Sequence, residues 1–387
     1  MTRPRRILNV ITRLEQGGAP LALLETTSRM DRSAFDLTIA AGETEEGAQD
    51  LDLTRSGFDL PILRVPSMRR SIHPLRDAMA LIQLIRIIAK GDYDLVHTHT
   101  SKAGLLGRIA ASLCGTRAIV HSSHGTILQG YFSPQVTRLF AAMERFAATL
   151  SDRIICLTSQ EIEQYLDVHI GSRGQYTCVC NGIDLDAFEQ ERGDRGTIRE
   201  EFGFSDEDVV CVTVGRLVPV KAQADLLEAL ATARQYVPSL KLLVVGDGEL
   251  RDDLEAQRHQ LGLTASVKLA GWREDIPRLL DACDVFVLTS LNEGLGLVLV
   301  EAMAKKLSVI ATAVGGVPEV VDDGVTGVLV PAGDVGSIAK AIQDLAADPE
   351  LRAGMGGAGY ARAHELFSIN QTVRNTEAIY RELLPQP

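Results

Sequence analysis

Short apolar runs, each followed by a longer stretch with helical spacing, constrain the fold of this chain more than any other feature of its sequence. Examples are "RRILNVI" at residues 5–11, "YDLVHTH" at 93–99 and "VVCVTV" at 209–214. Strands that are apolar along their length are buried on both faces, and strands that alternate with helices form parallel sheets. The pattern therefore predicts an α/β protein with parallel sheets covered by helices.

The pattern begins twice along the chain. "RRILNVITRLEQGGAPLALLE" at 5–25 and "DVVCVTVGRLVPVKAQADLLEAL" at 208–230 each read as a strand, a loop with glycine and a helix. A chain of 387 residues is long enough for two domains of ordinary size. We expect two Rossmann-like domains and a terminal helix, with these bounds: 1–187, 188–367 and 368–387.

Composition and charge exclude several classes of protein. Apolar residues make up 45% and charged residues 23% of the chain, which is typical of a folded globular protein. A net charge of -12 argues against a surface that binds nucleic acid throughout. The six cysteines are too scattered for a disulfide scaffold. No apolar run is long enough for a membrane span, and the N-terminus lacks a secretory signal, so we expect a cytoplasmic protein.

Two loops after expected strands could bind an anion, because ligands of open parallel sheets lie beyond the carboxyl ends of the strands. In "LEQGGAP", Gly17 and Gly18 allow close approach of a ligand, and the free amides of a helix start attract phosphate. In "GRLVPVK", Arg216 and Lys221 could together hold the two phosphates of a diphosphate. The alternatives are a tight turn for the glycines and solvated surface charges for the two cations.

The segment "NEGLGLVLVEAMA" at 292–304 places two carboxylates in unusual surroundings. Glu293 lies in a glycine-rich loop, and Glu301 lies inside an otherwise apolar helical pattern. A buried carboxylate needs a partner because an unpaired charge is costly away from water, and ribose hydroxyls would be suitable donors. The alternative for Glu301 is a glutamate on the helix surface beside a core stripe.

Histidines close two strands of the first half. His97 and His99 alternate and so face the same way, but no third ligand at suitable spacing supports a metal site. His124, which Gly125 follows, stands at a strand end where it could donate a hydrogen bond to a ligand or share a proton. A capping or packing role for His124 remains open.

Two nucleotide-binding fingerprints are absent from the sequence. "GDGELR" at 246–251 has arginine where the dinucleotide fingerprint has its third glycine, which removes the main support for a hydride-transfer enzyme. There is also no phosphate loop ending in Gly-Lys-Ser/Thr.

Residues 62–90 carry several cations and one acid, Asp77. They fit peripheral contact with an anionic membrane, binding of a lipid pyrophosphate, or a core helix with a solvated basic edge.

In combination, these motifs resemble glycosyltransferase family 4, the retaining enzymes with the GT-B architecture. The resemblance extends over nearly the whole chain and rests on eight segments in order: "GGAP", "VHTHTSKAGLLGR", "HGTILQGYFSP", "NGID", "GRLVPVK", "GDGEL", "NEGLGLVLVEAMA" and "GGVPEVVDDGVTGVLVPAGD". It implies two Rossmann-like domains that face each other across a cleft, with the nucleotide sugar held mainly by the second domain and the acceptor by the first. It also implies a terminal helix that crosses back to the first domain.

The resemblance assigns roles to individual residues. Arg216 and Lys221 would bind the donor diphosphate, Glu301 the ribose, and Glu293 with its following loop the sugar hydroxyls. His124 would line the sugar site. The remaining donor-binding positions are Gly17 and Gly18 by the phosphate, Gly294, Leu295 and Gly296 in the loop, the amides of Leu297 and Val298 at the diphosphate, and Arg273 by the base. The catalytic residues would be His124, Arg216, Lys221 and Glu293.

The resemblance also implies the reaction partners. No metal or cofactor is required, and the acceptor would be a glycan or polyprenyl-diphosphate-linked sugar of bacterial surface-polysaccharide synthesis. We expect a UDP-sugar as the donor, with GDP- and ADP-sugars as the alternatives. One departure is Ala222, because the family commonly has glycine after the lysine.

Three other functions remain open at this point. A nucleotide-sugar epimerase has the same architecture and would convert the donor without an acceptor. A non-catalytic nucleotide-sugar-binding protein is disfavoured because the charged residues and His124 are all present. A dehydrogenase is the least favoured because the dinucleotide fingerprint is incomplete.

Overall fold

The computed structural model describes four segments, namely residues 3–15, 18–44, 58–125 and 134–385. Contacts within the chain divide it into two compact units. The first consists of Met1–Asn181 with Ile369–Pro387, and the second of Gly182–Ser368. Residue 187, the boundary expected from the sequence, lies within α6, Leu185–Gln190.

A seven-stranded parallel sheet forms the centre of the first unit. Its order is β3-β2-β1-β4-β5-β6-β7. The strands are β1 (Arg5–Ile11), β2 (Phe35–Gly42), β3 (Ile62–Val65), β4 (Leu95–His99), β5 (Ala118–Ser122), β6 (Arg153–Cys156) and β7 (Tyr176–Cys178).

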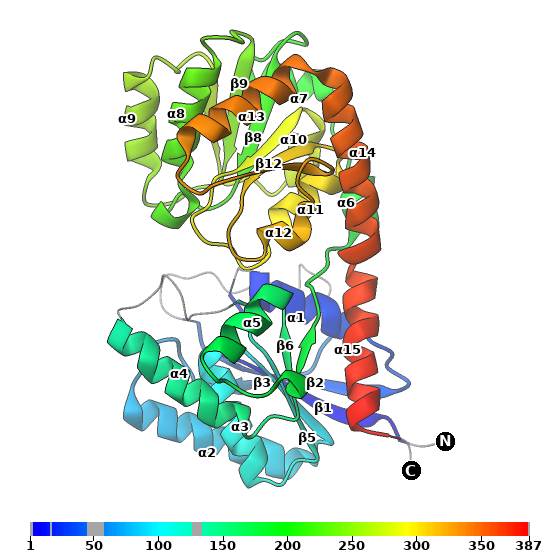
Figure 1. Cartoon of the computed structure of the whole chain (residues 1–387). Coiled ribbons are helices and arrows are strands. Elements are labelled where there is room, and N and C mark those ends of the chain that lie inside the picture. Colours follow the sequence, from blue (N-terminus) through cyan, green and yellow to red (C-terminus); the bar gives the residue numbers. More distant parts are fainter. Residues whose placement is uncertain (1–2, 16–17, 45–57, 126–133, 386–387) are drawn as a thin grey trace. The chain divides into compact units, whose positions relative to one another are not determined.

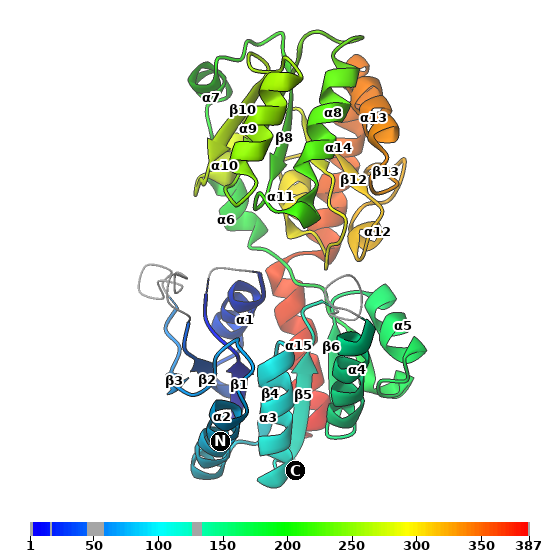
Figure 2. The same ribbon diagram turned by 90° about the vertical axis from the view of Figure 1, so that its left-hand side faces the viewer.

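Helices cover both faces of this sheet (Figures 1 and 2). The helices of the unit are α1 (Gly18–Arg29), α2 (Pro74–Gly91), α3 (Ser101–Leu113), α4 (Pro134–Ala148), α5 (Ser159–Asp167) and α15 (Ile369–Leu383), with a 3₁₀ turn at Arg173–Gln175. In β1, Leu8 and Val10 pack beneath α2 and α3, whereas Ile7 packs beneath α15 and Ile11 beneath α1. This alternation follows from the two-residue repeat of a strand and explains why β1 is apolar on both faces.

A six-stranded parallel sheet forms the centre of the second unit. Its order is β10-β9-β8-β11-β12-β13. The strands are β8 (Val209–Val214), β9 (Leu240–Val245), β10 (Val267–Gly271), β11 (Val285–Leu288), β12 (Ser308–Thr312) and β13 (Gly327–Val330).

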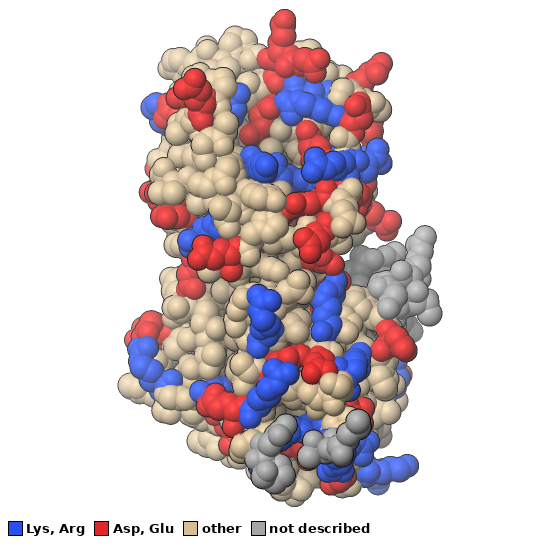
Figure 3. Space-filling view, turned by 90° about the vertical axis from the view of Figure 1, so that its right-hand side faces the viewer, with Lys and Arg blue, Asp and Glu red and all other residues tan. Residues whose placement is uncertain are grey.

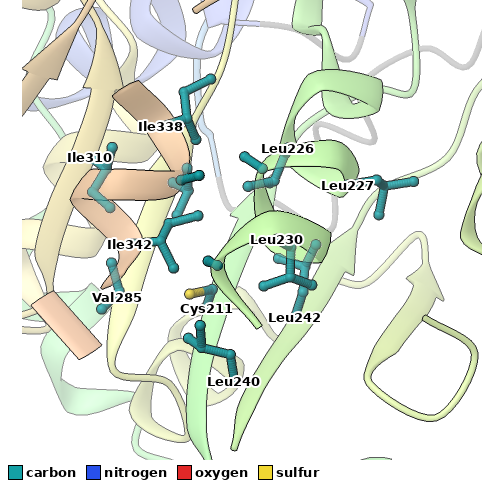
Figure 4. Close-up of a cluster of buried hydrophobic side chains, with 14 of the residues drawn as sticks. Cys211, Leu226, Leu227, Leu230, Leu240, Leu242, Val285, Ile310, Ile338 and Ile342 are labelled. Atoms are coloured by element: carbon teal, nitrogen blue, oxygen red, sulfur yellow. The ribbon is translucent and has the colours of Figure 1, made fainter. Parts of the chain in front are cut away.

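A large core of the second unit lies between this sheet and the helices α8 and α13 (Figure 4). The other face carries α11 and α14, which contact each other and β12. The helices are α6, α7 (Arg195–Phe202), α8 (Gln223–Ala233), α9 (Arg251–Gln260), α10 (Ile276–Asp281), α11 (Leu297–Ala304), α12 (Val317–Val320), α13 (Val335–Ala347) and α14 (Pro349–Leu366), with a 3₁₀ turn at Pro219–Lys221. The α/β fold class with two parallel, Rossmann-like sheets is thus confirmed.

Surface charge is mixed in sign. On the face shown in Figure 3, Lys and Arg side chains are interspersed with Asp and Glu over both units. An anionic ligand must therefore find a local arrangement of donors on that face. None of the described helices combines the length and the apolar character that a membrane span requires.

Candidate functional site

The loops after β8 and β11 meet where the strand order of the second sheet reverses. β9 and β10 lie to one side of β8, while β11, β12 and β13 lie to the other. Ligands of open parallel sheets bind at such switch points, outside the carboxyl ends of the strands. The two loops, residues 215–222 and 289–296, contain six of the positions expected from the sequence, namely Arg216, Lys221, Glu293, Gly294, Leu295 and Gly296.

Lys221 and Glu293 form an ion pair between these two loops. Nζ of Lys221 donates to Oε1 of Glu293, and the hydroxyl of Ser290 donates to the same carboxylate oxygen at 2.7 Å. The side chains of Lys221 and Glu293 are 23% and 11% exposed, so a ligand can reach the pair. In this structure the carboxylate balances the charge of Lys221.

Hydrogen bonds tie the two loops together. The hydroxyl of Thr289 lies 3.0 Å from the carbonyl oxygens of both Lys221 and Ala222, to which it can donate. The backbone N–H of Leu291 donates to the carbonyl of Val220 at 2.8 Å. These contacts fix the lysine-bearing loop against the glutamate-bearing loop before any ligand binds.

The backbone conformation explains two small residues of the site. At Gly315 the φ angle is 52°, and a Cβ atom there would lie 1.8 Å from the carbonyl oxygen of Glu293. Ala222 has φ 48° and ψ 40°, the left-handed conformation. Glycine adopts this conformation without steric cost, which gives a physical reason for the glycine that the family commonly has at the position of Ala222. Here the methyl group is accommodated, and no charge is lost.

Arg216 differs from Lys221 in that its guanidinium makes no hydrogen bond or ion pair within the described residues. It stands two residues after β8 and is exposed. Its carbonyl accepts a hydrogen bond from Nε2 of Gln223 at 2.9 Å. The backbone is therefore fixed, while the cation remains available to a ligand.

The N-terminus of α11 lies directly after the glutamate loop. Gly296 precedes the helix with φ 79°, so Leu297 and Val298 are its first residues. Their N–H groups have no carbonyl acceptor one turn earlier in the helix, and helix N-termini favour negative charge. Before them, Gly294 is exposed and Leu295 is buried.

Glu301 lies one turn further along α11. Its side chain has no hydrogen bond or ion pair in the described part of the chain. Burial raises the pKa of this carboxyl group from 4.5 to about 7. A ligand with hydroxyl donors would supply the partner that the carboxylate lacks.

Arg273 is placed differently from the other expected donor residues. Its guanidinium donates two hydrogen bonds of 2.8 Å to Asp275 and one of 2.6 Å to Glu201. It also lies over the ring of Phe202, with Cζ 5.9 Å from the ring centroid. These two carboxylates raise the pKa of Arg273 and hold it two residues after β10. It does not join the Lys221–Glu293 pair.

The first unit contains the remaining expected positions. Gly18 is the exposed first residue of α1, and nothing lies within 4 Å of where its Cβ would be. Gly17 lies outside the described residues. His124 follows β5 with φ 56°, a conformation that is unfavourable for a residue other than glycine.

His124 belongs to a network of buried polar side chains. Its Nε2 lies 2.9 Å from Nδ1 of His99, and Nε2 of His99 lies 3.1 Å from Oδ1 of Asn9. Burial lowers the pKa of His124 to about 4. Nearby, the two ring nitrogens of His97 bond the hydroxyls of Tyr380 at 2.7 Å and Ser122 at 2.8 Å.

Sequence reasoning missed Asn9 as a member of this network and Tyr380 as the hydrogen-bond partner of His97. A signal for Asn9 was present, because it is the one uncharged polar residue in the buried run "RRILNVI". No signal existed for Tyr380, which comes from α15, far away in the sequence. Among the described residues, no group of three or more His, Cys, Asp or Glu side chains is placed to hold a metal ion.

The site of the second unit thus combines an unpaired guanidinium, an ammonium group and the amides of a helix N-terminus. Such donors suit an anionic group, and the arginine and helix N-terminus in particular suit phosphate. Beyond them, the unpaired carboxyl group of Glu301 suits hydroxyl donors. The arrangement can bind a phosphorylated ligand that also carries hydroxyl groups.

Two family models match the chain. Residues 194–362 match the "Glycosyl transferases group 1" family, and residues 17–182 match the "Glycosyl transferase 4-like domain". The first match lies within the second unit, and the second match lies in the first unit except for its last residue, Gly182.

Individual proteins agree with these matches. The UDP-Gal:alpha-D-GlcNAc-diphosphoundecaprenol alpha-1,3-galactosyltransferase of Escherichia coli is 32% identical over 338 residues, which cover 86% of each chain. The putative glycosyltransferase EpsD of Bacillus subtilis is 30% identical and covers 86% of this chain and 87% of its own. The structure of Anabaena Alr3699/HepE in complex with UDP-glucose has a TM-score of 0.79 at 25% identity and covers 97% of this chain and 99% of its own. The chain therefore belongs to the group 1 glycosyltransferases with a glycosyltransferase 4-like first domain, and it is a glycosyltransferase of the GT-B fold.

Proposed function

We propose that the protein transfers a sugar, with retention of anomeric configuration, from a UDP-sugar to a polyprenyl-diphosphate-linked sugar or related glycan. Two comparisons support the choice of substrates. The name of the Escherichia coli relative specifies a UDP-galactose donor and a diphosphoundecaprenol-linked acceptor. The Anabaena protein was solved with UDP and with UDP-glucose.

The observation that carries this proposal is the set of donors at the β8–β11 switch point. Breaking the bond between the anomeric carbon and the diphosphate builds negative charge on the leaving group. Arg216, Lys221 and the amides at the start of α11 would stabilise that charge more in the transition state than in the ground state. Because the loops are already tied together, little reorganisation is needed when the charge develops.

We propose the remaining roles from the resemblance to the family. Glu301 would accept hydrogen bonds from the ribose hydroxyls, and Glu293 with residues 294–296 would bind the sugar. His124 and Gly18 of the first unit would contact the sugar and a phosphate, and Arg273 would lie by the base. Attack from the face of the leaving group retains the configuration and requires no enzymic nucleophile.

A ligand screen tests the nature of the donor. UDP-, GDP- and ADP-sugars are compared for protection against thermal unfolding, because a ligand that binds only the folded state raises its stability. UDP-sugars should protect most. The protecting sugar is then incubated with and without a lipid-linked acceptor. The proposal would be contradicted if only a GDP- or ADP-sugar protected the protein. It would also be contradicted if the donor were epimerised in the absence of an acceptor.

Two substitutions test the site. Arg216→Ala and Lys221→Ala should each lower kcat by about 10² to 10³, the typical cost of losing one donor to a developing charge, while both variants stay folded. Lys340→Ala on α13, which removes an exposed lysine paired with Asp344, is the matched control and should leave kcat unchanged. Near-normal turnover of both site variants would overturn the assignment.

A chelator tests the proposed independence from metal. Because fixed cations are expected to stabilise the leaving group, activity should persist after dialysis against excess EDTA. Loss of activity that returns on adding Mg²⁺ or Mn²⁺ would show that a divalent ion is required.

We also propose that α2 docks the protein on an anionic membrane surface, where a lipid-linked acceptor would reside. Leu75, Met79 and Ile82 are 74%, 54% and 48% exposed. Their spacing, with Arg86 and Lys90, places all five side chains on one face of the helix. Exposed apolar side chains beside cations suit the boundary between lipid head groups and acyl chains.

Vesicle flotation tests the docking of α2. Vesicles that contain phosphatidylglycerol should retain the protein, and combined substitution of Leu75, Met79 and Ile82 by Ser should abolish retention without loss of fold. Neutralising Arg69 and Arg70 should weaken retention mainly through Arg70, because Arg69 already pairs with Glu43 at 2.7 Å. Tyr236→Ser, at an exposed site of the second unit, is the control. Equal retention of all variants would exclude this surface.

A further inference from the structure

Three side chains at the carboxyl edge of the first sheet form a chain of hydrogen bonds. His99, the last residue of β4, has Nε2 at 3.1 Å from Oδ1 of Asn9 on β1. Its Nδ1 lies 2.9 Å from Nε2 of His124, which follows β5. Asn9 and His99 are 1% and 4% exposed. His99 is thus held from both sides, and His124 is held through it.

The side-chain carbonyl of Asn9 determines which nitrogen of each histidine ring carries the proton. A neutral imidazole has one N–H donor and one lone pair, and burial lowers the pKa of both His99 and His124. Because Oδ1 of Asn9 only accepts, Nε2 of His99 donates to it, and Nδ1 of His99 accepts from Nε2–H of His124. Nδ1 of His124 then carries a lone pair.

His124 and Asn9 also line a small cavity. Nδ1 of His124 and Nδ2 of Asn9 are both buried, and neither has a hydrogen-bond partner within the described residues. Both residues line a cavity of about 30 Å³, which has room for roughly one or two water-sized groups. An acceptor on His124 and a donor on Asn9 together complement a hydroxyl group.

The backbone at His124 also requires support. Its φ of 56° is unfavourable for a residue with a side chain. Such conformations persist only where the surroundings hold them, and they cluster at functional sites. The hydrogen bond from the ring to His99 is one such restraint, so the position of the ring depends on its neighbour.

We propose that His99, anchored by Asn9, is a positioning residue that fixes the tautomer and the ring plane of His124. Nδ1 of His124 then accepts a hydrogen bond from a hydroxyl group of the sugar, the kind of group that the cavity fits. The inference rests on the proposed function, which places the sugar at His124. His99 acts only through the ring of His124.

The matched control is His97, which lies on the same strand two residues away. It is equally buried, at 3% exposure, and its ring nitrogens bond Tyr380 and Ser122 instead of His124. The rings of His97 and His99 are in contact, with centroids 4.1 Å apart. Phenylalanine at either position keeps a ring in that contact and removes the hydrogen bonds.

The first measurement is spectroscopic and needs no substrate. Long-range ¹H–¹⁵N spectra of histidine-labelled protein report which ring nitrogen of His124 carries the proton. Wild type and His97→Phe should show Nε2–H alone, whereas His99→Phe should show a mixture of tautomers. Asn9→Leu removes the acceptor and should also lose the single tautomer. An unchanged tautomer in folded His99→Phe would overturn the proposal.

The second measurement is kinetic. His99→Phe should lower kcat by about 10- to 100-fold, because misplacing a group near the reacting atoms is costly, and should change the KM for the UDP-sugar less than about 3-fold. His97→Phe should stay within about 3-fold in both constants. Equal losses in the two variants would mean a general packing effect and would overturn the proposal. If the wild type transfers no sugar, the proposed function fails, and the spectra alone decide whether His99 sets the tautomer.

Discussion

At the scale of single residues, the second unit contains one carboxyl group whose protonation is set by burial. Glu301 has no partner among the described residues, and its pKa is raised to about 7. The folded protein therefore holds a proton that the unfolded chain would release between pH 4.5 and 7. The stability that this proton provides is complete below pH 4.5 and is lost as the pH rises through 7.

Substitution of Glu301 by Gln should remove this dependence on pH. At pH 4.5 the free energies of unfolding of Glu301→Gln and the wild type should be similar, because both side chains are neutral. At pH 8 the variant should be the more stable, by up to about 3 kcal/mol for a shift of this size. Urea unfolding of the second unit at both pH values measures the difference. A difference that is the same at both would contradict the raised pKa.

The sequence indicated the single residues of the site unevenly. Glu301 stood out because a carboxylate in an apolar helical pattern is rare. Arg216 and Lys221 stood out because they are cations that follow an expected buried strand. The sequence could not show that Glu293 would pair with Lys221, or that Arg273 would be held by Glu201 and Asp275. Such pairings depend on how loops distant in the sequence meet, which local patterns do not contain.

At the scale of elements, the junction between the turn Pro219–Lys221 and helix α8 depends on one residue. Ala222 ends the turn and precedes the helix in the left-handed conformation, and it is 9% exposed. An L-residue with a side chain gives up about 1 to 2 kcal/mol in that conformation. The orientation of Lys221 relative to the helix is set there.

The effect of a substitution at Ala222 on stability should therefore depend on how well the new residue adopts the left-handed conformation, and not on the size of its side chain. Ala222→Gly should leave the free energy of unfolding within about 0.5 kcal/mol of the wild type, because relief of strain offsets the greater entropy of the unfolded chain. Ala222→Val should cost at least about 2 kcal/mol. The control is Ala224→Gly inside α8, which should cost about 1 kcal/mol. Equal costs for glycine at 222 and 224 would contradict the role of the left-handed backbone.

At the scale of the whole molecule, the alternation of strands and helices was enough to predict two parallel sheets. The strand order follows from the right-handed connection of parallel strands and from two reversals, at β1–β4 and β8–β11. The pattern could not indicate which face of which sheet α15 would cover. In the structure, Val373, Ile379 and Tyr380 of that helix join the core beneath β1 and β4.

Truncation of Tyr380 should therefore destabilise the first unit and spare the second. The ring is 1% exposed and packs edge-on against Phe35 at 5.7 Å. Tyr380→Ala should cost about 3 to 5 kcal/mol. Hydrogen exchange should quicken in β1 and β4 and stay unchanged in β8 and β11. Tyr236→Ala, at an exposed site of the second unit, should change stability by less than about 0.5 kcal/mol. Faster hydrogen exchange in both sheets would contradict the expectation that the substitution destabilises only the first unit.

The return of the chain to the first unit through α15 has a consequence for biosynthesis. The ribosome makes β1 to β7 first, then the whole of residues 182–368, and only afterwards the helix that seals the underside of the first sheet. Domains fold as they emerge from the ribosome. The nascent first unit therefore exposes Ile7, Phe35 and Leu37 until synthesis of the second unit and of α15 is complete. Chaperones that bind exposed apolar strands should engage this intermediate and release it once α15 has been translated.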